Sequence, residues 1–234
     1  AEGFVAIQTD VSEREQLHQR LSIVNRVLRH DIRSAVSVIR GNTDLAKTEA
    51  GDIDAALDTI DAEAERLYQL SEKARHVENG LAGERVVRQN VDVCELLQTH
   101  LAQLQDRHPE VSIDADFPTS ARVTASVRLE DAIEELLRNA IEHNDACEPK
   151  LDVGVENTGE SPCSVNVRIE DNGPGIPDGE VKPLRKGEET ELEHTSGLGL
   201  WVVKWTVEES GGELSISETP DGGSQVSIEL PAAA

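Results

Sequence analysis

His30 is the residue of this chain whose surroundings most suggest chemistry. It is followed by Asp31, and Arg29 and Arg33 flank the pair. A neutral imidazole offers a nitrogen nucleophile near neutral pH, a neighbouring carboxylate can hold the proton of one ring nitrogen, and guanidinium groups suit phosphate. The pattern predicts a histidine that attacks a phosphoryl group, and the alternative is an ordinary solvated side chain.

A second set of polar residues is spaced along a predicted helix over 126–144. Glu135, Asn139 and His143 follow at intervals of four, so they share one face of that helix. An amide oxygen is a suitable ligand for Mg²⁺. Asn139 is therefore a candidate metal ligand, with an ordinary polar helix face as the alternative.

Two glycine motifs come later in the chain, Asp-Asn-Gly-Pro-Gly over 171–175 and Ser-Gly-Leu-Gly-Leu over 196–200. A carboxylate at the end of a strand, as expected for Asp171, can accept a hydrogen bond from an adenine amino group. Glycines let the backbone approach a base closely, and glycine-rich backbone at a helix start presents N–H groups to phosphates. Each motif alone is weak, because Asp-Asn-Gly is usually only a turn.

The segment 177–196 between these motifs shows no clear periodicity and carries Lys182, Arg185 and Lys186. Such a composition predicts a mobile lid over phosphates. The chain has no GxxxxGK[ST] sequence, which excludes a P-loop ATPase.

A helical hairpin must present His30. Apolar residues recur at steps of three and four from Leu17 to Ile39 and from Ile53 to Leu67, and Gly51-Asp52 separates the two seams. The steps Val24–Leu28–Ile32 form a stutter, and His30 lies about 180° from the seam there, so it must face water.

Such a narrow seam buries little by itself. Pairing two hairpins into a four-helix bundle would cover it, so we expect a homodimer through residues 15–80. The hairpin pattern ends near Asn79-Gly80, where we place a domain boundary.

Residues 81–234 predict an α+β two-layer sandwich with helices on one face of a mostly antiparallel sheet. Helices are expected over 93–107, 126–144 and 198–210, and strands over 111–116, 151–157, 164–170, 213–217 and 224–230.

The composition is strongly acidic. Among 234 residues there are 46 Asp and Glu against 22 Lys and Arg, a net charge of −24, and no Met. This balance predicts a surface adapted to high salt and a halophilic archaeal source, with an acidic mesophilic protein as the alternative. Such a negative surface repels nucleic acid, so the composition does not favour nucleic acid binding.

The chain contains no apolar run near the roughly 20 residues that cross a bilayer. Its three cysteines lack CxxC spacing, which favours a reducing, cytoplasmic location. The stretch 16–43 departs from the acidic background, with five Arg and Asp31 as its one acid.

Taken together, the motifs resemble those of the GHKL (HATPase) ATP-binding fold, and with the His30 hairpin the chain resembles the core of a sensor histidine kinase. The resemblance covers about residues 12–234 and rests on four motifs in the right order. Residues 1–14 also resemble the last strand of a PAS sensor domain, over 3–9, and its linker, so we expect an upstream PAS domain in the same chain.

The resemblance implies ATP and Mg²⁺ as cofactors and a receiver domain of a response regulator as partner. It implies that His30 is the phosphoacceptor and that Asp31 is its general base. It also implies that the Asp171 carboxylate binds adenine and that Asn139 binds Mg²⁺. His143 falls where relatives place an aromatic residue against adenine. The other residues implied at the nucleotide are Gly173, Gly175, Arg185, Lys186, Gly197, Leu198 and Gly199.

This sequence departs from the family pattern at three positions. Ala35 stands where proline is common, so bending of the helix must come from the stutter, and Glu142 stands where a basic residue is frequent. Ser34 takes the place of the Thr or Asn of relatives with phosphatase activity, and its hydroxyl would orient a water less firmly.

Two other functions stay open. One is a GHKL ATPase that hydrolyses ATP, in which Glu135, also a candidate metal ligand, would activate water. The other is a degenerate kinase that acts as a dimeric signalling scaffold.

Overall fold

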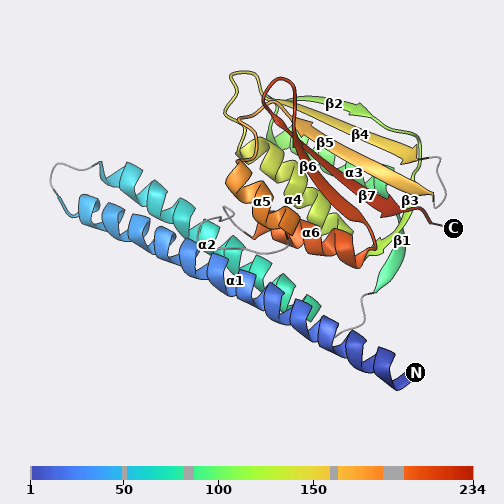
Figure 1. Ribbon diagram of the computed structural model, residues 1–234. Helices are drawn as coiled ribbons and strands as arrows, with labels where there is room; N and C mark the ends of the chain where they lie inside the picture. The colour runs from blue at the N-terminus through green and yellow to red at the C-terminus, as the bar shows by residue number, and fades with distance from the viewer. Residues whose placement is uncertain (1, 49–51, 82–86, 159–162, 187–197, 234) are drawn as a thin grey trace. The chain divides into compact units, whose positions relative to one another are not determined.

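The computed structural model describes residues 2–48, 52–81, 87–158, 163–186 and 198–233. The chain forms two compact units. One is built on two long helices, and the other on a five-stranded sheet with its helices (Figure 1). Among the described residues, none of the helices has the length and apolar character required to span a bilayer.

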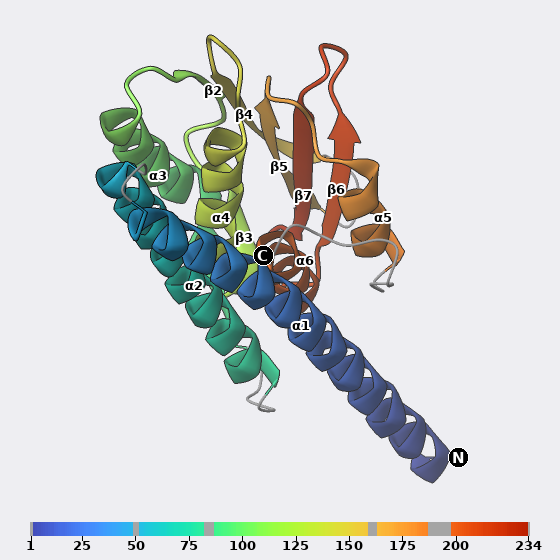
Figure 2. The same cartoon turned by 90° about the vertical axis from the view of Figure 1, so that its left-hand side faces the viewer.

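The helical unit is a hairpin of α1 (Glu2–Ala46) and α2 (Ile53–Leu81), which lie side by side in both views (Figures 1 and 2). The Asp52 carboxylate accepts a hydrogen bond from the Ala55 N–H at 3.2 Å. This contact satisfies one of the unpaired N–H groups at the start of α2 and explains why the helix begins there.

Within one chain, the predicted seam of α1 is only partly buried. The helix buries Val24, Val27, Asp31 and Ala35, whereas Ile32 is 46% exposed. Steps of three and four along this line keep it facing α2, and Ile32 falls on the neighbouring stripe, where it is exposed. The stutter therefore does not describe the contact with α2.

The strand expected over 3–9 is wrong, since these residues belong to α1. A single strand leaves its backbone groups unpaired unless another strand lies beside it, whereas a helix pairs them within one segment. No neighbouring strand is found in the helical unit as far as the structure describes it.

The sheet unit is built on five strands in the order β2-β4-β5-β7-β6. β2 pairs with β4 in parallel, and the other pairs are antiparallel. Val165, Val167 and Ile169 of β5 are buried and alternate with more exposed polar residues, which is typical of a sheet covered on one face. The bounds are β2 Ser112–Asp116, β4 Lys150–Thr158, β5 Ser164–Asp171, β6 Glu213–Glu218 and β7 Ser224–Pro231.

Helices α3 (Val93–Arg107), α4 (Leu129–Glu142) and α6 (Gly199–Glu209) lie on one side of this sheet (Figures 1 and 2). This arrangement confirms the predicted α+β architecture, with helices on one face of a mostly antiparallel sheet. The prediction omitted β1 (Arg88–Asp92) and β3 (Arg122–Ser126), which form a separate antiparallel pair, and α5 (Asp178–Lys186).

Candidate functional site

His30 projects from α1 with 64% of its side chain exposed, as its position opposite the seam predicted. Its Nδ1 lies 3.1 Å from Oδ1 of Asp31, whose side chain is only 9% exposed. An ionised carboxylate can only accept, so this contact places the ring proton on Nδ1 and the lone pair on Nε2. The arrangement defines which nitrogen can act as a nucleophile.

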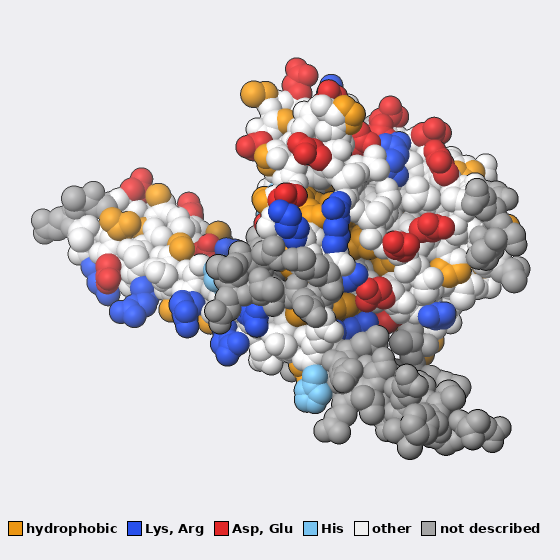
Figure 3. Space-filling model, viewed as in Figure 1, with side chains coloured by type: hydrophobic (Ala, Val, Ile, Leu, Met, Phe, Trp, Pro, Cys, Tyr) orange, Lys and Arg blue, Asp and Glu red, His pale blue; other side chains and the backbone are white. Residues whose placement is uncertain are grey.

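The surroundings of His30 are basic. Arg26, Arg29, Arg33 and Arg40 are spaced by three, four and seven residues, so their side chains leave α1 within about 60° of one another. We call this stripe the arginine face. It lies between His30 and the exposed Ile32, and Figure 3 shows Lys and Arg side chains gathered over α1. Ser34, one turn after His30, is exposed as well.

In the sheet unit, three predicted site residues follow one another along α4 and its C-terminal cap, and each is more exposed to solvent than the one before. Glu135 is buried, Asn139 is half-buried, and His143 is exposed. His143 caps the C-terminus of α4, where its N–H donates to the Asn139 carbonyl at 3.3 Å. The Glu135 carboxylate forms an ion pair with Arg138.

Asp171 is the last residue of β5 and is half-buried. Its Oδ1 accepts hydrogen bonds from the N–H groups of Gly173, at 2.8 Å, and Ser224, at 3.4 Å. Burial raises the pKa of Asp171, although these N–H groups act in the opposite direction. The carboxylate is thus oriented by the backbone and poorly solvated.

The loop after Asp171 is packed too closely for side chains. A Cβ atom at Gly173 would lie 3.0 Å from the Asp171 carboxylate, and one at Gly175 would lie 3.0 Å from the Gly222 carbonyl. Gly175 also has a φ of 78°, which favours glycine. These glycines bring the β6–β7 turn against the Asp171 loop.

Ser224 was missed by the sequence analysis. It begins β7, 53 positions after Asp171, and antiparallel pairing of β5 with β7 brings it to the carboxylate. The Gly222-Gly223 pair before the strand was the available signal, because it indicates a turn with close backbone approach.

A bridge of asparagine side chains holds this region to the end of α4. Asn172 Oδ1 accepts from the Asn144 side chain at 3.0 Å and from the Lys150 N–H at 2.7 Å. Asn172 Nδ2 donates to the Glu148 carbonyl at 2.9 Å. The bridge fixes the α4–β4 loop against the strand end that carries Asp171.

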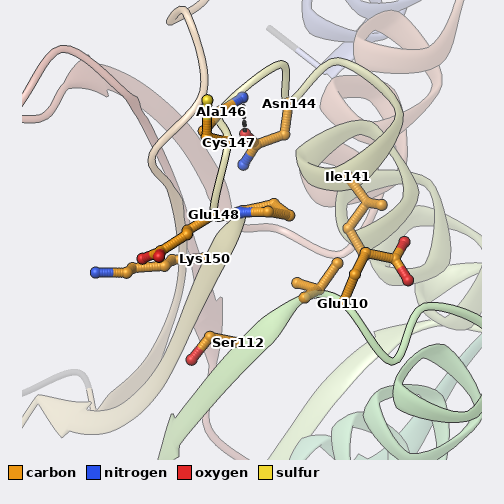
Figure 4. Close-up of a pocket in the computed structure, with 10 residues that line it drawn as sticks. Glu110, Ser112, Ile141, Asn144, Ala146, Cys147, Glu148 and Lys150 are labelled. Atoms are coloured by element: carbon orange, nitrogen blue, oxygen red, sulfur yellow. Dashed lines mark hydrogen bonds between the residues drawn. The ribbon is translucent and has the colours of Figure 1, made fainter.

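A hollow of about 580 Å³ is lined in part by that loop (Figure 4). It is lined by residues including Glu110, Ser112, Cys147 and Lys150, and Asn144 forms part of its wall. Neither Asp171 nor Asn139 lines it. The hollow is therefore distinct from the predicted nucleotide site.

The predicted lid is only partly described. Residues 178–186 form α5 rather than an irregular segment, with the Glu180 and Val181 N–H groups bonded to the Pro177 carbonyl. Lys182 pairs with Asp178 at 3.0 Å, and Arg185 is exposed. The Lys186 side chain and Gly197 lie outside the described residues, whereas Leu198 and Gly199 are buried.

Mg²⁺ requires few protein ligands when it is held through substrate phosphates. Among the described residues, no three His, Cys, Asp or Glu side chains converge to hold a metal ion. The half-buried Asn139 amide nevertheless fits a Mg²⁺ ion of this kind, because one or two protein oxygens suffice.

Residues 124–234 match the family described as "Histidine kinase-, DNA gyrase B-, and HSP90-like ATPase". The chain is also 26% identical to the nitrogen regulation protein NtrY of Azorhizobium caulinodans and 25% identical to the signal transduction histidine-protein kinase AfsQ2 of Streptomyces coelicolor. These alignments cover 98% and 99% of the chain. Residues 124–234 are therefore similar to the ATP-binding domains of this family, and the whole chain is similar to parts of these two proteins.

The chain spans less than half of these curated relatives, 31% of NtrY and 45% of AfsQ2. Among solved structures, the histidine kinase AdeS of Acinetobacter baumannii is similar over 88% of this chain and 98% of its own, with a TM-score of 0.64 and 22% identity. The histidine kinase ThkA, solved in complex with the response regulator TrrA, is similar over 96% of this chain and 66% of its own, with a TM-score of 0.70 and 21% identity. At these identities the likeness concerns the fold alone.

Proposed function

We propose that the chain is the core of a two-component sensor histidine kinase that phosphorylates His30 from ATP and passes the phosphoryl group to an aspartate of a receiver domain. The observation that carries the proposal is the exposed His30 whose Nδ1 is held by the nearly buried Asp31. The signal transduction histidine-protein kinase AfsQ2 among the relatives supports the same function.

The nucleotide would lie between α4 and the end of β5. Asp171 accepts a hydrogen bond from the adenine amino group, and His143 covers one side of the base. Backbone N–H groups at Gly197, Leu198 and Gly199 bind phosphates, as do Arg185 and Lys186. Asn139 would hold Mg²⁺, which offsets phosphate charge when it is bound.

In the proposed reaction, Nε2 of His30 attacks the γ-phosphorus of ATP in line with the bond to the leaving oxygen. The Nε2–P bond forms, the bond between phosphorus and the β,γ-bridging oxygen breaks, and ADP leaves. Asp31 retains its hydrogen bond to Nδ1–H and stabilises the positive charge that develops on the ring. Positioning supplies most of the rate.

The arginine face supports the choice of an acidic protein partner. In a chain with 46 acidic residues, the stretch 16–43 has one acid, Asp31, and that side chain is nearly buried. A receiver presents acidic residues around its phosphoacceptor aspartate, so the arginine face would guide that pocket to His30.

The exposed apolar residues of the hairpin support a homodimer. Ile32, Val36, Leu45, Ile53 and Leu57 are between 42% and 55% exposed. Burying exposed apolar side chains such as Ile32 and Val36 against a second copy would form the four-helix bundle predicted for residues 15–80. Phosphatase assistance by Ser34, an upstream PAS domain and a halophilic source remain predictions.

The test is incubation of the protein with γ-labelled ATP and Mg²⁺. We expect label on the protein that is stable to base and labile to acid, and its loss in His30→Gln. His18→Gln is the matched control, since His18 is also exposed on α1. Release of free phosphate without labelled protein would favour the ATPase alternative, and neither product would favour the scaffold.

A further inference from the structure

Glu135 is a nearly buried carboxylate whose two oxygens both face groups of this chain. Its side chain is 8% exposed, and Oε2 pairs with the Arg138 guanidinium one turn further along α4. Oε1 lies against Gly199, the first residue of α6. A carboxylate held in this way is placed to fix two helices rather than to activate a water molecule.

Gly199 leaves the space that the carboxylate occupies. A Cβ atom at this position would collide with Glu135 Oε1 and would lie 3.0 Å from Cδ and 3.4 Å from Cγ. Among the described glycines, positive φ angles occur at Gly175, Gly211 and Gly222, and Gly199 is not one of them. Space rather than backbone conformation favours glycine at 199, and a larger residue would have to displace the Glu135 carboxylate.

The position of this contact connects it to the nucleotide. α4 and α6 pack side by side, and a carboxylate near a helix N-terminus is electrostatically favourable. Arg138, which holds Oε2, immediately precedes Asn139, and its Nε lies 3.8 Å from Glu142 Oε1. The contact thus joins the turn that carries the predicted metal ligand to the helix that follows the predicted phosphate loop.

We infer that Glu135 is a positioning residue. Its carboxylate, held by Arg138, seats the first turn of α6 against α4 and thereby sets where the N–H groups at that helix start meet the phosphates. The inference rests on the proposed ATP site and assigns Glu135 a role other than metal ligand or water-activating base.

A double-mutant cycle of Glu135→Ala and Gly199→Ala tests this role through the affinity for a non-hydrolysable ATP analogue with Mg²⁺. In the otherwise natural protein, Gly199→Ala is expected to weaken binding about tenfold or more, as contacting residues couple on this scale. In the Glu135→Ala background, the space is empty and Gly199→Ala should weaken binding by less than about twofold. Equal weakening in both backgrounds would overturn the inference.

Thermal unfolding of the same four proteins separates this inference from the proposed function. Gly199→Ala should lower the melting temperature of the natural protein but should not lower it with Glu135→Ala, because the space for the methyl group is then free. Trp201 and Trp205, the two tryptophans of the chain, lie in α6 with ring centroids 5.6 Å apart and report on it by fluorescence. A natural protein that binds no nucleotide would refute the proposed function, and the unfolding cycle would still decide the contact.

Glu135→Gln distinguishes positioning from chemistry. The amide keeps the shape of the carboxylate and loses its charge, so KM for ATP should rise more than kcat falls. Glu134→Gln, an exposed neighbour, is the control and should change neither. A loss of about 100-fold or more in kcat with KM unchanged would make Glu135 a catalytic base and would contradict the inference.

Discussion

Asp171→Asn should weaken nucleotide binding without loosening the fold. The oxygen of the substituted amide could still accept from the Gly173 and Ser224 N–H groups, which bond Asp171 Oδ1 at 2.8 and 3.4 Å. The NH₂ group of that amide, however, would stand where the second carboxylate oxygen meets the adenine amino group, and two donors would face each other. A hydrogen bond to a charged group contributes about 1.5–3 kcal/mol, so Kd should rise by about 10- to 150-fold.

The free energy of unfolding of Asp171→Asn should stay equal or rise, although the affinity for the nucleotide falls. Burial raises the pKa of Asp171, so the folded state disfavours the ionised carboxylate at neutral pH. Replacement by the neutral amide removes that penalty, and stability should be equal or higher. Since adenine requires the ionised form, binding by the natural protein should fall as the pH drops through this raised pKa, above the usual range for aspartate.

Isothermal titration with a non-hydrolysable ATP analogue and urea unfolding of the same samples measure both quantities. Asp114→Asn is the matched control, because Asp114 is exposed on β2. Unchanged affinity in Asp171→Asn, or an equal loss in Asp114→Asn, would refute the assignment of Asp171 to adenine.

Three further predictions concern other parts of the molecule. Replacing Arg29 and Arg33 by Glu should slow phosphotransfer to the cognate receiver at low salt and have less effect at molar salt, measured by transfer kinetics from phosphorylated protein; equal rates at both salts would refute steering by the arginine face. Ile32→Glu should shift the protein from dimer to monomer in sedimentation equilibrium, and an unchanged dimer would contradict the proposed interface. Asp92 accepts from the Cys94 N–H at 3.1 Å at the start of α3, so Asp92→Ala should cost about 1 kcal/mol in urea unfolding at pH 7. The Ser120 hydroxyl lowers the pKa of Asp92, so this loss should fade in acid as the natural carboxylate takes up its proton through that lowered pKa; a difference independent of pH would refute the cap.

Much of the sheet unit could be predicted because its elements carry local signals. A helix was predicted over 93–107, the same residues that form α3 in the structure. β1 and β3 are short and largely polar, and they are recognisable only through their pairing with each other. The sequence could not show which apolar residues of α1 contact α2. Ile32 and Val27 both fit a helical pattern, and only the structure shows that Val27 is buried and Ile32 exposed.

The sequence showed the motifs of the candidate site, but it did not show which residues of different motifs contact each other. Ser224 reaches Asp171 through strand pairing, and Gly199 meets Glu135 through helix packing, in both cases across more than 50 residues. Spacing along one helix placed Glu135, Asn139 and His143 together, but it could not reveal that the first is buried and the last exposed.

The central claim is that ATP phosphorylates His30 on Nε2. It is tested most directly by tandem mass spectrometry under non-acidic conditions, with ³¹P NMR to distinguish the two phosphohistidine isomers. The account predicts a phosphoryl group on His30 at Nε2, since Asp31 holds Nδ1 at 3.1 Å. Phosphate on another residue, or on Nδ1 of His30, would contradict it.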